Sequence, residues 1–463
     1  AWLWARTVKC PNPACGAQMP LVRSFELSKK KGRKAWVEPH VDPRTREISF
    51  EVRTGNGTAR EGTVNRRGAT CIACGSPVPF DHIRAEGKAG RMGAQLMAIV
   101  TEGQNGRSYY APDEYHVRVA EQAQPGWRPD HPLPHNPRDF KTPNYGMRTF
   151  ADLFTPRQLV ALTTFSDLVN EAREQVYADA LAAGLPDDGV PLREGGSGAR
   201  AYAEAVSVYL AFGVSRQSNR LSTICFWDQQ RENIQQVFAR QAIPMTWDYT
   251  EANPFSASSG SFLGQIDYPA KVVESNSATK SGYAYQHDAT QPLRDTDALV
   301  FATDPPYYDN IGYADLSDYF YAWLRPCLRE IYPDIFATLL TPKDPELIAS
   351  PHRHDGDPSR AVEHFETGFV AAFRNFRQHT HEMFPLTLFY AFKQTEAEVL
   401  YGAVDQAVSS TGWETMLEGL IQTGFEVTGT WPIRTEFTRG LKLTVNALAS
   451  SIVLVCRPRP DDA

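Results

Sequence analysis

The stretch ALVFATDPPYYDNIGYADLSDYF, residues 298–320, places an acid, two prolines and two tyrosines where an apolar run ends. Four consecutive residues could act on a planar exocyclic amine: Asp304, Pro305, Pro306 and Tyr307. The carboxylate of Asp304 and the carbonyl of Pro305 can each accept one amine hydrogen, which leaves the nitrogen lone pair facing an electrophile. Proline rings stiffen the turn, and Tyr307 offers a ring on which a base can stack. Because a base inside a duplex cannot reach such a turn, its substrate must be flipped out or single-stranded.

Four cysteines in two pairs form a second chemical pattern. The pairs are Cys10-x4-Cys15 and Cys71-x2-Cys74, and a glycine follows each pair. Each pair brings two thiolates to one tight turn, where the glycine relieves backbone crowding. Two such turns supply the four soft ligands that structural zinc prefers, and a closed site of this kind has no open position for catalysis. We therefore predict a structural zinc site. The other cysteines are expected to be core residues: Cys225, Cys327 and Cys456.

A basic turn lies between the two cysteine pairs. The segment SFELSKKKGRKAWVEP is typical of two strands around a lysine-rich tip. The basic side chains of this tip are Lys29, Lys30, Lys31, Arg33 and Lys34. Residues 1–91 hold 17 Lys and Arg against 8 Asp and Glu, whereas the rest of the chain holds 30 against 46. The tip could therefore contact nucleic-acid phosphates, although a solvated hairpin end explains the same residues equally well.

Composition and cysteine count limit the class of protein. The chain has 463 residues, of which 42% are hydrophobic and 22% charged, as in ordinary globular proteins of two or three domains. The apolar run VSVYLAFGV at 206–214 is too short to cross a membrane. Seven cysteines, an odd number, argue against a disulfide scaffold and for a reducing compartment. We therefore expect a cytoplasmic protein without a membrane partner.

Residue patterns divide the chain into four segments. These are 1–91, a zinc ribbon with the basic hairpin; 92–145, an irregular linker; 146–245, a helical segment; and 246–463, an α/β core. The linker is rich in Pro, Asn and Asp. In the helical segment, Thr155 is a good N-cap before Pro156, and RENIQQVFARQA at 231–242 continues the helical pattern.

From about residue 281 the patterns of strand and helix alternate. DALVFATD is typical of a buried strand, LTLFYAF of the next strand, and FEVTGTWPI and SSIVLVCRP of two closing strands. DLSDYFYAWLRP predicts a helix that Pro326 stops, and SRAVEHFETGFVAAFRNFRQ a long amphipathic helix. This order predicts an α/β sheet that is largely parallel. Ligands bind at the carboxyl ends of such strands, which is where Asp304 lies.

The string DPPYYDNIGYADLSDYFYAWLR and the segment with the cysteine pairs resemble a bacterial family. These are adenine-specific DNA methylases that carry domain of unknown function 1156 at their amino end. DPPY also resembles motif IV of S-adenosylmethionine-dependent amino-methyltransferases, which modify adenine N6 or cytosine N4. The resemblance covers essentially the whole chain. It implies a Rossmann-like methyltransferase core with an inserted zinc ribbon and a helical segment.

The same resemblance implies cofactor, partners and target. It implies S-adenosylmethionine as cofactor and DNA as partner, and some members are associated with anti-phage defence or restriction-modification, where other defence proteins would be partners. The aspartate form of the motif implies adenine as the target. The family also needs a glycine-rich loop after a strand to hold the cofactor. Gly195-Gly196-Ser197-Gly198 follows a polar segment, and FSASSGSF at 255–262 lacks a preceding strand pattern. In the family this loop lies upstream of the cysteine pairs, so we expect it to precede Ala1 and expect this chain by itself to transfer little or no methyl.

Two polar segments favour plain loops. TWDYTEANPFS at 246–256 could line the cofactor or base pocket, but a polar loop is the simpler interpretation. SPHRHDGD at 350–357 contains His352 and His354, and a solvated loop is the simpler interpretation there than a metal site.

Three functions are consistent with these residues. The preferred function is an S-adenosylmethionine-dependent DNA methyltransferase acting on adenine N6. The alternative enzyme is a methyltransferase acting on RNA or on cytosine N4. The alternative from another class is a zinc-ribbon nucleic-acid binding protein whose methylase core is inactive.

Overall fold

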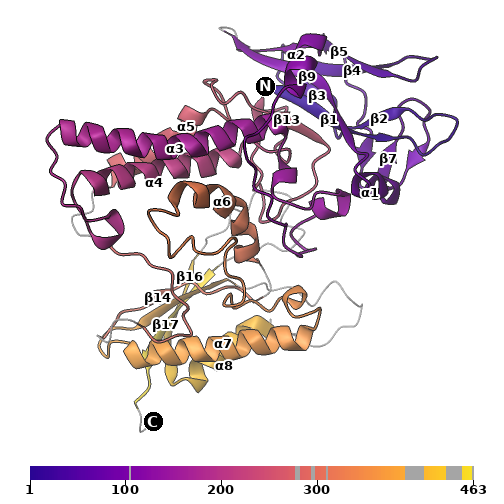
Figure 1. Ribbon diagram of the computed structural model, residues 1–463. Helices are drawn as coiled ribbons and strands as arrows, with labels where there is room; N and C mark the ends of the chain where they lie inside the picture. The colour runs from indigo at the N-terminus through magenta and orange to yellow at the C-terminus, as the bar shows by residue number, and fades with distance from the viewer. Residues whose placement is uncertain are drawn as a thin grey trace, which may run out of the picture. The chain divides into compact units, whose positions relative to one another are not determined.

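A computed structural model describes residues 1–103, 106–276, 282–293, 298–308, 311–391, 411–433 and 451–460. Its strands and helices form a mixed α/β architecture, which confirms the expected fold class at this level (Figure 1). The chain divides into two compact units. The first comprises Ala1–Ser281 and Asp315–Thr341, and the second comprises Gly282–Ala314 and Pro342–Ala463.

The first unit contains a five-stranded antiparallel sheet in the order β10-β9-β1-β13, with β2 also paired to β1. These strands are β1 (Trp2–Lys9), β2 (Gln18–Leu21), β9 (Gly93–Gly103), β10 (Gly106–Tyr110) and β13 (Asp248–Glu251). Trp2 on β1 faces Glu251 on one side and Ile99 on the other. Because β13 pairs with β1, the residues from 246 to 281 belong to this unit and not to the α/β core predicted from the sequence.

The expected irregular linker over 92–145 is wrong in its first part. β9 and β10 form a hairpin there, and α2 (Glu114–Glu121) follows. Five consecutive residues of β9, from Leu96 to Val100, are buried, because β9 lies inside the sheet between β1 and β10. The Pro-rich stretch from 122 to 141 carries no named helix or strand.

The cysteine-rich part of this unit consists of two small antiparallel sheets. One has β3 (Glu26–Ser28), β4 (Ala35–Val41) and β5 (Ile48–Thr54), and the other has β6 (Val64–Asn65), β7 (Gly68–Thr70) and β8 (Pro77–Val78). The helix α1 (Phe80–Lys88) follows. The basic turn joins β3 to β4, so the predicted hairpin is confirmed.

The first unit also contains four longer helices: α3 (Pro156–Ala182), α4 (Ala199–Ser218), α5 (Phe262–Ser275) and α6 (Tyr313–Leu328). The first two residues of α6 belong to the second unit. The described residues also form four short 3-10 turns: η1 (Thr142–Tyr145), η2 (Ala151–Leu153), η3 (Leu192–Glu194) and η4 (Pro351–Arg353). The predicted start of α3 is confirmed, because the Thr155 hydroxyl accepts from the Gln158 N–H and the Gln158 side chain accepts from the Thr155 N–H. Within the described residues, no helix combines the length and apolar character needed to cross a membrane.

Two helix predictions are wrong in detail. Residues 231–242 are not helical, because the hairpin of β11 (Trp227–Asp228) and β12 (Asn233–Ile234) occupies this region. Glu232 there has a φ of +52°, which a right-handed helix does not permit. Pro326 does not stop α6, because the Arg329 N–H still bonds to a carbonyl one turn earlier and the helix ends only at Leu328.

The second unit contains a four-stranded sheet in the order β14-β15-β17-β16. The strands are β14 (Ala302–Thr303), β15 (Leu386–Ala391), β16 (Phe425–Ile433) and β17 (Ser451–Pro458). Only β14 and β15 pair in parallel, because β17 lies between β15 and β16 and runs opposite to both. The expectation of mostly parallel pairing is therefore wrong. Among the described strands, the expected buried strand β14 is short and lies at the edge of the sheet, and Val300, two residues before it, is 61% exposed.

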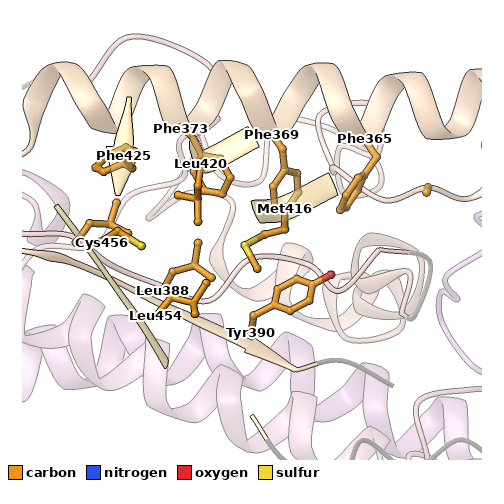
Figure 2. Packing of buried hydrophobic residues seen from close by; sticks show 12 residues of the cluster. Phe365, Phe369, Phe373, Leu388, Tyr390, Met416, Leu420, Phe425, Leu454 and Cys456 are labelled. Atoms are coloured by element: carbon orange, nitrogen blue, oxygen red, sulfur yellow. The ribbon is translucent and has the colours of Figure 1, made fainter. Parts of the chain in front are cut away.

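The core of this unit forms between its sheet and two helices, α7 (Pro358–His379) and α8 (Thr411–Gln422). Figure 2 shows aromatic side chains of α7 pointing toward the strands. Side chains of this core include Phe365, Phe369, Phe373, Leu388, Tyr390, Met416, Leu420 and Leu454. The three phenylalanines follow one another at intervals of four residues, so they lie on one face of α7 and confirm the predicted amphipathic helix.

Candidate functional site

The Asp304–Tyr307 turn follows β14 directly, at the carboxyl end of this strand, which runs parallel to β15. The Asp304 side chain is exposed, and the three residues after it are half-buried. The Tyr307 hydroxyl donates a hydrogen bond of 2.6 Å to Oδ1 of Asp304. The structure thus brings the four residues selected from the sequence together in one turn, with the acid already oriented by the tyrosine.

The chain after this turn is held in an uncommon conformation. Tyr308 has a φ of +51°, a region that bulky residues rarely adopt unless their surroundings impose it. Its ring packs edge-on against Phe365 with 5.2 Å between centroids, and the ring of Tyr307 meets Tyr390 in the same way at 5.5 Å. Both tyrosines of the turn are therefore anchored in the hydrophobic core of the second unit.

Residues 346–353, distant in sequence from the turn, hold the chain that follows it. Oε1 of Glu346 accepts from the Ala314 N–H at 3.1 Å, and the Ala349 N–H donates to the Tyr308 carbonyl at 3.3 Å. Arg353 lies 2.7 Å from Oε2 of Glu346, and both side chains are largely buried. Nothing in the spacing of Glu346 and Arg353 indicated this role, because they reach the turn only through the tertiary structure.

Tyr313 is a second aromatic residue near the acid that the sequence interpretation missed. Burial and the carboxylates of Asp304 and Glu346 raise the pKa of its hydroxyl. Its side chain remains 53% exposed, so its ring is accessible. The sequence could have indicated Tyr313 as a site residue, because it lies within the stretch 298–320 that contains the turn.

The four paired cysteines converge as predicted and are positioned to hold a metal ion. Their Sγ atoms all lie within 4.8 Å of one another, with 3.7 Å between Cys10 and Cys74 and 3.9 Å between Cys15 and Cys71. The glycines after the pairs, Gly16 and Gly75, have φ angles of +61° and +75°, which explains why glycine stands at both positions. Among the described residues this is the one group of three or more metal-binding side chains that comes together.

The four thiols differ in their environments. Burial raises the pKa of Cys10 to about 12, whereas hydrogen bonds from the hydroxyl and N–H of Ser76 lower the pKa of Cys74 to about 6. Asn12 donates to the same Ser76 hydroxyl at 3.1 Å. Cys225, Cys327 and Cys456 are buried and unpaired with one another, as expected of core residues.

The basic hairpin is partly neutralised by neighbouring acids. Lys29 pairs with Glu26 at 2.6 Å, and Lys30 pairs with the buried carboxylate of Glu232. Glu232 also accepts from the Tyr109 hydroxyl at 2.9 Å, so it links the hairpin to β10. Lys30 is half-buried, whereas the other four cations of the tip are exposed: Lys29, Lys31, Arg33 and Lys34. The five basic residues selected from the sequence are therefore not equivalent, which only the fold reveals.

Two loop expectations need correction. The segment at 350–357 is not a plainly solvated loop, because Ser350 is 1% exposed and its hydroxyl lies 3.0 Å from Nδ1 of His352. The ring of His354 lies tilted against that of His364, with 5.1 Å between the ring centroids. The segment at 255–262 does follow a strand, because β13 ends at Glu251 and α5 begins at Phe262. By contrast, the loop at 195–198 leads into α4 from η3, as its polar context indicated.

No known protein family, curated protein or solved structure matches this chain.

Proposed function

We propose that this protein is an S-adenosylmethionine-dependent methyltransferase that modifies adenine N6 in DNA and that its second unit is part of a Rossmann-like core. The observation that carries the proposal is the Asp304 carboxylate, exposed after β14 and bonded to the Tyr307 hydroxyl. The turn lies at the carboxyl end of β14, which pairs in parallel with β15, and ligands bind at the carboxyl ends of strands in α/β sheets.

In this proposal the turn holds the amine of a flipped-out or single-stranded base. Asp304 keeps a second carboxylate oxygen free of the Tyr307 bond and accepts one amine hydrogen with it, while the Pro305 carbonyl accepts the other. The bound cofactor would supply an electrophilic methyl group. The methyl–sulfur bond of the cofactor would break as the nitrogen–carbon bond forms, leaving a neutral thioether, and the amine would lose one proton, which the Asp304 carboxylate is placed to accept. The exposed ring of Tyr313 and the ring of Tyr307 provide surfaces for the base.

The residues that would hold the cofactor are not assigned. In the described part of the second unit, the turn after β14 contains no glycine, and no strand is followed by a glycine-rich loop. The proposal therefore concerns the amine site, and the chemistry of methyl transfer is inferred from the resemblance to the amino-methyltransferases.

We further propose that the metal of the four-cysteine group is structural zinc. Tetrahedral coordination with zinc–sulfur bonds of about 2.3 Å requires sulfur atoms about 3.8 Å apart. The distances of 3.7 Å and 3.9 Å between the cysteine sulfurs fit this requirement. Four thiolate ligands leave no open position for a substrate, so the metal would stabilise the fold that carries the basic hairpin.

The partner in this proposal is DNA, contacted by the exposed cations of the hairpin, and defence-system proteins are further candidate partners. The alternative enzyme, acting on RNA or on cytosine N4, uses the same amine site. The non-enzymatic alternative, a zinc-ribbon nucleic-acid binding protein, is favoured by one observation: the cysteine group and the basic hairpin both lie in the first unit and do not involve Asp304.

Transfer of a tritiated methyl group, measured with protein expressed from its complete gene, separates these functions. DNA with adenine should be labelled, DNA without adenine should not, and RNA of the same sequence should be labelled far less. Labelling of cytosine or RNA instead would select the alternative enzyme. If nucleic acid binds but no substrate is labelled, the binding protein is the correct function.

A further inference from the structure

The four cysteines of the metal-binding group differ in their exposure to solvent. Cys10 and Cys71 are buried and Cys15 is half-buried, whereas Cys74 is exposed. Coordination of zinc by four thiolates does not by itself require one ligand to lie at the surface. Cys74 is therefore the ligand that a small molecule in solution reaches first, which makes it a candidate site of chemical modification.

Polar groups surround the sulfur of Cys74. Asn12 Nδ2 donates to it at 3.9 Å, and the hydroxyl oxygen of Ser76 lies 3.2 Å away. Nη1 of Arg46 donates to the Ala73 carbonyl at 3.4 Å, so an exposed cation borders the same turn. Cysteines that react with oxidants are accessible and lie in polar, electropositive surroundings, which favour the nucleophilic thiolate. Cys74 has such surroundings.

A second thiol lies close enough to complete a reversible oxidation. The sulfurs of Cys10 and Cys74 are 3.7 Å apart, and a disulfide bond brings two sulfurs to about 2.05 Å. Because Cys10 is buried, it is shielded from an oxidant but faces the sulfur of Cys74. The sulfurs of Cys15 and Cys71 are 3.9 Å apart, but neither of these residues is exposed. Exposure therefore favours the disulfide that contains Cys74.

We propose that hydrogen peroxide oxidises this protein at Cys74 and that the product, a disulfide between Cys74 and Cys10, releases the metal. The inference rests on the proposed zinc and not on methyl transfer, since neither cysteine belongs to the Asp304 turn.

The oxidation takes place in two steps. The Cys74 thiolate attacks one peroxide oxygen, the oxygen–oxygen bond breaks, and the sulfur becomes a sulfenic acid while hydroxide leaves and takes up a proton to form water. The Cys10 thiolate then attacks the sulfur of Cys74, the sulfur–oxygen bond breaks, and a second hydroxide leaves and is protonated to water. In total, two thiolates lose two electrons, and one peroxide gains them together with two protons.

The disulfide acts on the fold through the metal. It leaves only Cys15 and Cys71 as thiolate ligands, whereas structural zinc is held by four ligands. The first cysteine pair lies between β1 and β2 and the second between β7 and β8, so the metal joins the five-stranded sheet to the small sheet of β6, β7 and β8. Loss of the metal therefore lowers the stability of this part, and a thiol reductant together with zinc restores it.

The test starts from zinc-loaded protein purified with a thiol reductant, which is then removed. Hydrogen peroxide is added, released zinc is followed with a metallochromic indicator, and disulfides are located by mass spectrometry of peptides from the unreduced protein. We expect about one zinc to be released for each Cys10–Cys74 disulfide that forms. The midpoint of thermal unfolding should fall, and dithiothreitol with zinc should restore it.

Two variants with the same ligand types separate the roles of the sulfurs. Cys74→His removes the exposed sulfur but keeps a zinc ligand, because three cysteines and one histidine also form structural zinc sites. It should release zinc at least about tenfold more slowly than the wild type. Cys15→His keeps the Cys10–Cys74 pair and should still form that disulfide. Cys327→Ala, which removes a buried thiol outside the group, should respond as the wild type does. Zinc content before oxidation checks that each variant is loaded.

Three results would overturn the proposal. These are zinc that stays bound in millimolar peroxide, a wild-type disulfide between Cys15 and Cys71 in place of the expected one, and equal rates of zinc release in the wild type and the Cys74 variant. Protein that purifies without zinc would contradict the metal assignment, and the position of the disulfide in that protein would still decide the site of oxidation.

Discussion

The Tyr307 hydroxyl donates a 2.6 Å hydrogen bond to Oδ1 of Asp304, so the aromatic residue and the acid of the turn form one unit. This relationship changes what the two side chains are expected to do. Tyr307 not only offers a ring to a base but also fixes the carboxylate in one orientation. Its own ring is in turn fixed by the edge of Tyr390.

In protein expressed from the complete gene, we expect Asp304→Ala to lower methyl transfer by about 100-fold or more, because misplacing the amine disrupts alignment with the electrophile. The effect should fall on kcat rather than on DNA affinity, since the interaction acts mainly in the transition state. Tritiated-methyl transfer measures it, with the exposed Asp344→Ala in the same unit as control. Unchanged activity in the Asp304 variant would show that the motif is only a structural turn without a role in catalysis.

Tyr307→Phe and Tyr307→Ala should separate orientation from stacking. The phenylalanine variant keeps a ring for the base but loses the hydrogen bond to Asp304, so kcat should fall while DNA affinity stays near that of the wild type. The alanine variant should also lose stacking of about 1–3 kcal/mol, seen as weaker binding. Equal kinetics of the phenylalanine variant and the wild type would contradict the orienting role.

Elemental analysis of purified protein should find about one zinc per chain, bound by Cys10, Cys15, Cys71 and Cys74. Cys71→Ser should lose the metal and lower the midpoint of thermal unfolding, because metal binding stabilises only the folded site. Cys327→Ala, a change at a buried cysteine outside the group, should retain the metal. Protein free of metal, or full retention by the Cys71 variant, would contradict the assignment.

The cations of the hairpin should contribute unequally to DNA binding. Changing Lys31 and Lys34 together to glutamine should weaken binding to all sequences. It should also flatten the slope of log affinity against log salt concentration by about 0.9 for each phosphate that is no longer neutralised. Lys30→Gln should act mainly on stability, costing about 1–3 kcal/mol, because it leaves the buried Glu232 carboxylate without its cation. Filter binding across salt concentrations and thermal unfolding distinguish the two effects. If the slope of log affinity against log salt concentration is the same in the wild type and the double variant, the tip does not contact DNA phosphates.

Asp248 should make the first unit less stable as pH rises. Burial raises its pKa to about 6 in the folded protein, above the ordinary value near 3.9, so its contribution to stability is full below pH 4 and is lost as pH rises through 6. Asp248→Asn retains an oxygen to accept the 2.8 Å hydrogen bond from the Arg23 N–H. The variant should therefore exceed the wild type by about 1–2 kcal/mol at pH 8 and equal it at pH 4. Unfolding at both pH values checks this, and a constant difference would exclude Asp248 as the cause.

Local features of the fold were predictable because they depend on neighbours in sequence. The cap of α3 at Thr155, the amphipathic face of α7 and the β3–β4 hairpin each follow from a few consecutive residues. The cysteine pairs were also recognisable, since each pair occupies one turn and needs only one partner pair. The Asp304 turn was found because acid, prolines and aromatics coincide where a strand pattern ends.

By itself, the sequence determined these local elements and the residue types that could perform chemistry. Only the tertiary structure decided how they are used: β9 lies inside the sheet, β14 lies at an edge, and Glu232 neutralises Lys30. These outcomes depend on contacts between residues far apart in the chain, such as Trp2 on β1 and Glu251 on β13. Strand order and direction in such pairings depend on which surfaces bury each other, and a pattern of consecutive residues does not encode that choice.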